Sequence, residues 1–81
     1  MYTIEIQKEL GEILGKVLKR EDVELDQNTK ASDVQGWDSL TNMLFINEIE
    51  KHYMIRFSFR EIVKMTNVGE LCSAILSKLG K

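Results

Sequence analysis

Apolar residues recur at three- and four-residue spacing along most of this 81-residue chain, and this periodicity constrains the fold more than any other feature. The first stretch shows it clearly, with apolar positions at Ile6, Leu10, Ile13, Leu14, Val17 and Leu18. We expect a helix from about Thr3 to Lys19, with Thr3 available as an N-cap. Proline is absent, so only glycines and capping residues divide the chain into elements.

The next two helices are indicated by periodicity and by a capping motif. A second helix is expected from about Ser39 to Tyr53. A short third helix should begin after Ser58, because Ser58 and Glu61 fit the capping-box pattern of Ser at the N-cap and Glu at N3. This third helix should end near Lys64.

The fourth helix closes the predicted fold. Asn67 begins it as a candidate cap, Gly80 ends it, and its apolar side consists of Val68, Leu71, Cys72, Ile75, Leu76 and Leu79. Residues 20–38 form a long connection in which Val23, Leu25 and Val34 can pin the loop to the core. The prediction is an all-α four-helix bundle with a long loop between helices 1 and 2 and a short third helix, in one domain of residues 1–81.

Two glycines lie four residues apart in the first predicted helix. Gly11 and Gly15 each cost about 1 kcal/mol relative to Ala in a helix interior. Either they permit the close approach of a neighbouring segment, or the fold tolerates them without a packing reason. The sequence leaves both interpretations open.

Composition excludes several classes of function. A net charge of −2 argues against a nucleic-acid-binding module, and a lone cysteine excludes an intrachain disulfide. The chain has no metal-ligand cluster and no apolar run long enough to span a membrane. The charged residues within Met1–Leu10 are not those of a signal peptide. We therefore expect a cytoplasmic, monomeric protein with no metal, no membrane insertion and no nucleic-acid partner.

The stretch Gly36-Trp37-Asp38-Ser39-Leu40 carries the strongest functional signal. Ser39 would lie at the start of the second helix, where free backbone N–H groups and the helix dipole favour an anion. The only histidine, His52, lies roughly 20 Å further along the same helix and cannot act as its base. An isolated Asp-Ser pair such as Asp38 and Ser39 would far more often be an ordinary N-cap, but the neighbouring residues change this balance. We predict no catalytic residue here and interpret Ser39 as an attachment point.

The second helix has two apolar sides. Phe45, Ile46, Ile49 and Tyr53 form the side expected to face the core. On nearly the opposite side lie Leu40, Met43, Leu44 and Asn47, the candidate partner-binding residues. Either the long loop covers this second side, or it is a docking surface for a partner. The two interpretations combine if Leu40 lies beneath the loop while Met43 and Leu44 are exposed.

Three other side chains are candidates for a role. Trp37 either packs beneath the long loop or flanks whatever is attached to Ser39. Cys72 is expected to be a small buried hydrophobe, because it lies on the apolar side of the last helix. His52 is expected to be solvated.

Nearly the whole chain resembles the acyl and peptidyl carrier proteins. The resemblance includes Gly36–Leu40, the ending Glu48–Tyr53 of the second helix, the turn Ile55–Ser58 and the start Thr66–Leu71 of the last helix. It implies that a phosphopantetheinyl transferase uses coenzyme A and a divalent metal to place 4′-phosphopantetheine on Ser39, with Asp38 assisting at this step. The thiol of the arm then holds acyl or aminoacyl groups as thioesters, and the carrier itself catalyses nothing.

The resemblance also implies the partners. They would be loading, elongating or transferring enzymes of fatty-acid and other lipid, polyketide or nonribosomal peptide biosynthesis. The alternative is a protein-interaction module on the same fold that is never modified.

The chain departs from its family in charge. Fatty-acid-synthesis carriers are strongly acidic along the second helix, whereas residues 40–47 are uncharged here, with Leu44 and Thr41 at commonly acidic positions. The region of the third helix is basic, through Arg56, Arg60 and Lys64. These departures predict a dedicated carrier of a specialised pathway, such as polyketide, lipid-modification or nonribosomal chemistry.

Overall fold

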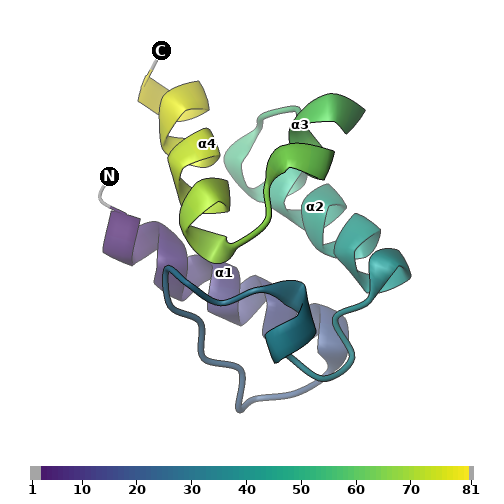
Figure 1. The fold of residues 1–81 in the computed structure, drawn as a ribbon. Helices are drawn as coiled ribbons and strands as arrows, with labels where there is room; N and C mark the ends of the chain where they lie inside the picture. Colours follow the sequence, from purple (N-terminus) through teal and green to yellow (C-terminus); the bar gives the residue numbers. More distant parts are fainter. Residues whose placement is uncertain (1–2, 81) are drawn as a thin grey trace.

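Four α-helices and a single 3₁₀ turn make up the regular structure of the described residues, 3–80, in a computed structural model (Figure 1). The elements are α1 (Thr3–Leu18), η1 (Ala31–Asp33), α2 (Ser39–Tyr53), α3 (Phe59–Lys64) and α4 (Val68–Gly80). This confirms the all-α fold class, the long connection between α1 and α2, and the short third helix. The turn η1 was not predicted.

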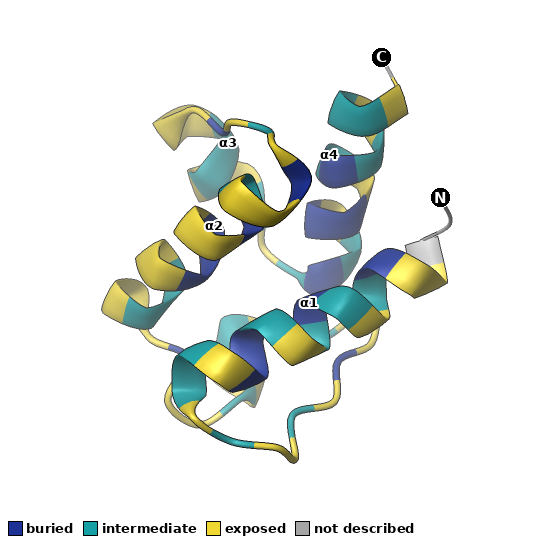
Figure 2. Cartoon of the chain, turned by 180° about the vertical axis from the view of Figure 1, so that it is seen from behind, coloured by how far each residue is buried: buried dark blue, intermediate teal, exposed yellow. Residues whose placement is uncertain are grey.

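The core lies where α1, α2 and α4 converge (Figure 2). Its fully buried large side chains are Ile6, Leu10, Leu14, Phe45, Ile49, Val68, Cys72 and Ile75. All of them lie on the helix sides that periodicity assigned to the interior, and Cys72 is the small buried hydrophobe expected. The short α3 has no buried residue and rests on the bundle through partly buried Ile62.

Local hydrogen bonds set the starts of α3 and α4 as the sequence predicts, whereas the expected Thr3 cap of α1 lies outside the side chains that the structure describes. Ser58 Oγ accepts from the Glu61 backbone N–H at 3.1 Å, and the Ser58 N–H donates to Glu61 Oε1 at 2.7 Å. This is the expected capping box of α3. At α4, Asn67 Oδ1 accepts from the Glu70 N–H at 2.8 Å, which confirms Asn67 as the cap.

The connection between α1 and α2 is anchored along its length. Leu25 is buried, and Val23 and Val34 pack against the core, as predicted. The loop also satisfies two N–H groups in the first turn of α4, because Val68 N–H donates to Thr29 O at 2.9 Å and Gly69 N–H donates to Gln27 O at 2.8 Å. The loop is therefore held against α1 and the start of α4 (Figure 1).

The end of α1 explains one of its two glycines. Lys19 adopts a left-handed conformation with φ 59°, and the Arg20 N–H donates to Gly15 O at 2.9 Å, which turns the chain back on the helix. A Cβ on Gly15 would lie 2.8 Å from the Arg20 backbone oxygen, whereas one on Gly11 would lie 3.6 Å from Val23 O. Close approach is thus required at Gly15 and not at Gly11.

These two glycines should respond oppositely to substitution. We expect Gly15→Ala to destabilise the fold by about 1–3 kcal/mol, because a backbone atom must shift to relieve the overlap. Gly11→Ala should stabilise it by up to about 1 kcal/mol through helix propensity. Urea unfolding followed by circular dichroism measures both, and equal effects of the same sign would contradict the assignment.

Candidate functional site

Asp38 begins α2 as its N-cap. Its backbone is extended, and its Oδ1 accepts from the Thr41 backbone N–H at 2.9 Å, while its carbonyl accepts from the Asn42 N–H at 2.8 Å. The Thr41 backbone N–H, followed by the Thr41 side chain, lowers the pKa of the Asp38 carboxyl. The site therefore presents a fixed negative charge at neutral pH, directly before Ser39.

Ser39 is the first residue of α2 and is exposed. Its hydroxyl makes no hydrogen bond to any described residue. The cap is thus supplied by Asp38, and the Ser39 hydroxyl remains available for modification at the positive end of the helix. An exposed, uncommitted hydroxyl at this position fits a covalent phosphodiester.

The only histidine lies at the far end of α2. His52 Nε2 is 3.6 Å from Glu9 Oε1 on α1, and Tyr53 OH also donates to Glu9. His52 is exposed, as expected, and its half-exposed ring also approaches Glu9 and so helps to join α2 to α1. Its distance along the helix from Ser39, roughly 20 Å, leaves the serine without a base.

Trp37 anchors the chain immediately before the site. It is buried, its Nε1–H donates to Asn42 Oδ1 at 3.0 Å, and its ring meets Phe45 edge-to-face at a centroid distance of 5.3 Å. The loop-anchor interpretation of Trp37 is therefore correct. The role of Asn42 was not predicted from the sequence. The feature that could have indicated it is the presence of a polar residue on the core-facing side of α2.

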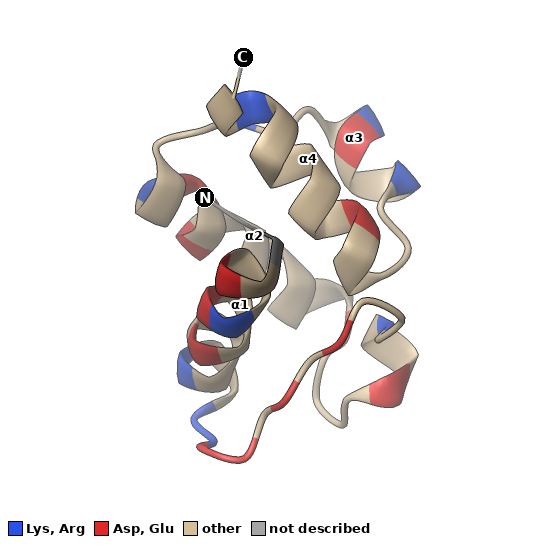
Figure 3. Cartoon of the chain, turned by 90° about the vertical axis from the view of Figure 1, so that its left-hand side faces the viewer, with Lys and Arg blue, Asp and Glu red and all other residues tan. Residues whose placement is uncertain are grey.

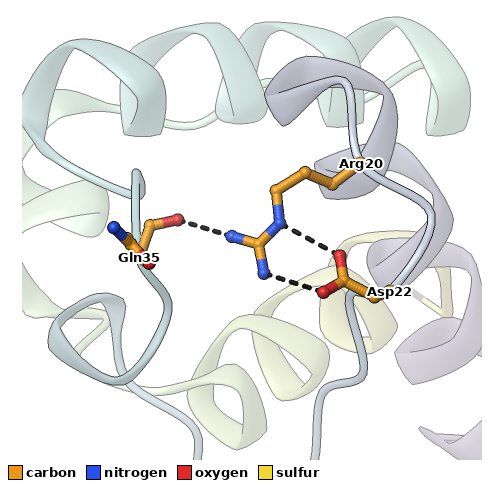
Figure 4. A network of polar contacts seen from close by, with 3 residues as sticks. All are labelled: Arg20, Asp22 and Gln35. Carbon is orange, nitrogen blue, oxygen red and sulfur yellow. Dashed lines mark hydrogen bonds and ion pairs between the residues drawn. The ribbon is translucent and has the colours of Figure 1, made fainter.

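A second anchor joins the end of α1 to the segment before Gly36 (Figure 4). Arg20 Nη1 donates to the Gln35 carbonyl at 2.8 Å, and its Nε and Nη2 donate to Asp22 Oδ1 and Oδ2 at 3.0 and 3.3 Å. This hydrogen bonding with Asp22 raises the pKa of Arg20 and lowers that of Asp22. Gly36 then turns with φ 92°, a conformation that favours glycine.

The second apolar side of α2 is exposed. Leu40, Met43 and Leu44 retain 73%, 50% and 51% of their accessible surface, and Asn47 is exposed beside them. Of the two interpretations left open, cover by the loop is wrong, for Leu40 as well, whereas Met43 and Leu44 are exposed as the combined interpretation has them. The physical reason is that the loop is fastened to α1, to α4 and to the core below Trp37, on the opposite side of α2.

A small cavity lies between α2, α3 and η1. It measures about 30 Å³ and is lined by Trp37, Asn42 and Ile46 on one side and by Ile62 and Met65 on the other. This is room for about one water molecule. α3 therefore packs against the half of α2 that begins at Ser39.

Comparison with known proteins agrees with this geometry. The sequence profile described as the phosphopantetheine attachment site matches residues 8–75. The chain belongs to the acyl carrier protein family. Its cofactor is covalently bound 4′-phosphopantetheine, and it is a carrier protein of a kind that is generally not catalytic.

A solved structure of this family is closely similar. The solution NMR structure of a holo acyl carrier protein from Geobacter metallireducens is 35% identical, with a TM-score of 0.85. The match covers 91% of this chain and 85% of that protein. No curated protein sequence gives a significant match. Family membership favours the modified carrier over the unmodified interaction module.

Among residues 3–80, no helix combines the length and the apolar character that crossing a bilayer requires.

Proposed function

We propose that Ser39 is the attachment residue for phosphopantetheine and that the chain presents thioester-bound intermediates to partner enzymes. The observation that carries this proposal is the exposed hydroxyl of Ser39, which has no hydrogen-bond partner among the described residues. It lies at the positive end of a 15-residue helix, and Trp37 and the Asp38 cap hold the chain rigidly before it. A rigid start places the hydroxyl reproducibly for a transferase.

The attachment reaction balances as a phosphoryl-group transfer. Ser39 Oγ forms a new bond to the coenzyme A phosphorus nearest pantetheine, the pyrophosphate bond breaks, and adenosine 3′,5′-bisphosphate leaves with the electron pair. The hydroxyl proton passes to a base of the transferase, because no base lies beside Ser39 in this chain. Once bound, the arm supplies a thiol that holds acyl or aminoacyl cargo as a thioester.

Asp38 is assigned a role in this step. Asp38 directly precedes Ser39 in the chain, and its ionised carboxylate would help to hold the divalent metal that accompanies coenzyme A. Asp38→Asn tests this role, because Asn is an equally good N-cap and preserves the helix start. We expect modification to slow by about 10–100-fold at unchanged stability. A rate equal to that of the wild type would remove Asp38 from the transfer step.

The exposed side formed by Leu40, Met43, Leu44 and Asn47 is proposed as a contact surface for these partners. Its lack of charge supports a dedicated carrier of a specialised lipid, polyketide or nonribosomal peptide pathway. The monomeric state and the cytoplasmic location stay predictions.

Intact mass spectrometry tests the proposal. The wild-type chain, incubated with coenzyme A, magnesium and a broad-specificity phosphopantetheinyl transferase, should gain the mass of one phosphopantetheine. Peptide mapping should place the added mass on the peptide containing Ser39. A folded chain that gains no mass would support the unmodified interaction module instead.

A further inference from the structure

The outer side of α3 has an unusual combination of exposed side chains. Phe59 and Val63 retain 75% and 62% of their accessible surface, and they lie four residues apart in one stripe. Arg60 and Lys64, also exposed and four residues apart, form a second stripe directly beside the first. These four residues are called the α3 face below.

The positive charge of this face is not neutralised locally. Arg60, Lys64 and the nearby Arg56 have no ion-pair partner among residues 3–80. The acidic residue within α3, Glu61, does not pair with these cations. Its Oε2 pairs with Lys78 Nζ at 2.9 Å, and its Oε1 accepts a hydrogen bond from the Ser58 backbone N–H. Figure 3 shows basic residues on α3 on either side of its acidic one.

Negative charge is concentrated in another part of the molecule. Residues 1–27 hold four basic and seven acidic side chains, whereas residues 28–81 hold seven basic and six acidic ones. Acidic residues follow one another along the loop after α1, at the end of the molecule away from α3 (Figure 3). An acidic partner would therefore be attracted at α3 and repelled at this loop, which fixes its orientation.

The α3 face lies on the Ser39 side of the molecule. On its inner side, Ile62 shares the small cavity with Asn42 and Ile46, three and seven residues after Ser39. α3 therefore lies beside the first two turns of α2, close to the helix start at which an enzyme would reach cargo on Ser39. Exposed apolar side chains beside unpaired cations are complementary to a partner surface that offers apolar contacts together with acidic groups.

We propose that the α3 face is a docking surface for a carrier-dependent enzyme that presents acidic residues around an apolar slot. This inference rests on the proposed function of Ser39. It assigns the partner a charge opposite to that of the basic enzymes that dock on acidic carriers. Phe59 and Val63 would fill the slot, and Arg60 and Lys64 would meet its acidic rim.

Steady-state kinetics tests the proposal with the holo chain as the substrate of each carrier-dependent enzyme encoded beside its gene. The variant Arg60→Glu/Lys64→Glu is compared with the control Lys8→Glu/Lys19→Glu, which makes the same change in net charge at two exposed positions on α1 and directly after it. We expect the α3 variant to lower kcat/KM by about tenfold or more with at least one enzyme, through KM, and the control to lower it by less than about twofold. The difference should shrink between about 0.01 M and about 0.15 M salt. Phe59→Ser should raise KM without this salt dependence.

Several outcomes would overturn the proposal. Equal losses in both double variants would indicate net charge alone, and a gain in the α3 variant would indicate a basic partner. Unchanged kinetics, with binding to phosphatidylglycerol vesicles lost in the α3 variant, would assign the face to a membrane surface. Each variant is first loaded with coenzyme A and weighed: a wild type that gains no mass refutes the Ser39 assignment, whereas normal loading with unchanged kinetics refutes only the α3 proposal.

Discussion

Ser39→Ala is expected to abolish the gain of phosphopantetheine mass completely, because the reaction consumes the Ser39 hydroxyl itself. The fold should be unaffected, since this side chain is exposed and makes no hydrogen bond to a described residue. The helix cap is also preserved, because Asp38 supplies it. Intact mass after incubation with coenzyme A, magnesium and the transferase measures the effect, and circular dichroism confirms that the variant is folded.

Ser32→Ala is the matched control for this experiment. Ser32 is also an exposed serine, located in η1, and its loss should leave the mass gain unchanged. Full modification of Ser39→Ala would refute the assignment of the site, as would a loss of modification in Ser32→Ala. A loss confined to Ser39→Ala assigns the attachment point.

Trp37→Ala is expected to lower the free energy of unfolding by about 3–5 kcal/mol. The substitution removes a buried ring, its edge-to-face contact with Phe45 and the hydrogen bond to Asn42. Native proteins typically have a free energy of unfolding of about 5–15 kcal/mol, and small domains are only marginally stable. The expected loss is therefore a large fraction of the stability of this domain. Urea unfolding must be followed by circular dichroism, because Trp37 is the only tryptophan and its fluorescence is lost.

Trp37→Phe separates packing from hydrogen bonding. It retains most of the aromatic contact but leaves Asn42 without its donor, so the expected loss is about 1–3 kcal/mol. The Ala variant should also be modified more slowly at Ser39 under conditions in which it is still folded, because the segment before Asp38 loses its anchor. A loss below about 1 kcal/mol for Trp37→Ala would show that the loop is held without it.

Most of the secondary structure could be predicted because it depends on neighbours in the sequence. The expected start of α2 at Ser39 and the bounds of α3 match the structure, and α1 ends one residue earlier than expected. Caps such as Ser58 and Asn67 bond to a residue three positions further along the chain, so they can be recognised from the sequence alone. The short turn η1 was missed because it has neither the length nor the periodicity of a helix.

Interactions between distant residues were not predictable in this way. The reason for Gly15 appears only when Arg20 folds back over it, and the contact of His52 with Glu9 joins residues on two helices. The loop is fastened to α4 by Gln27 and Thr29, whose backbone carbonyls carry no sequence signal. Each of these depends on where the chain returns in space.

The sequence by itself determined the helices, their caps, the apolar sides and the serine at the start of α2, because these follow from residue type and local spacing. Only the tertiary structure decided that Leu40, Met43 and Leu44 are exposed and that Trp37 belongs to the core. The physical reason is that burial of an apolar side is favourable whether a loop of the same chain or a partner protein covers it, so residue type alone does not distinguish the two. The anchors at Trp37 and in the loop after α1 hold that loop against the other side of the bundle. The side of α2 that carries Leu40, Met43 and Leu44 is therefore left exposed.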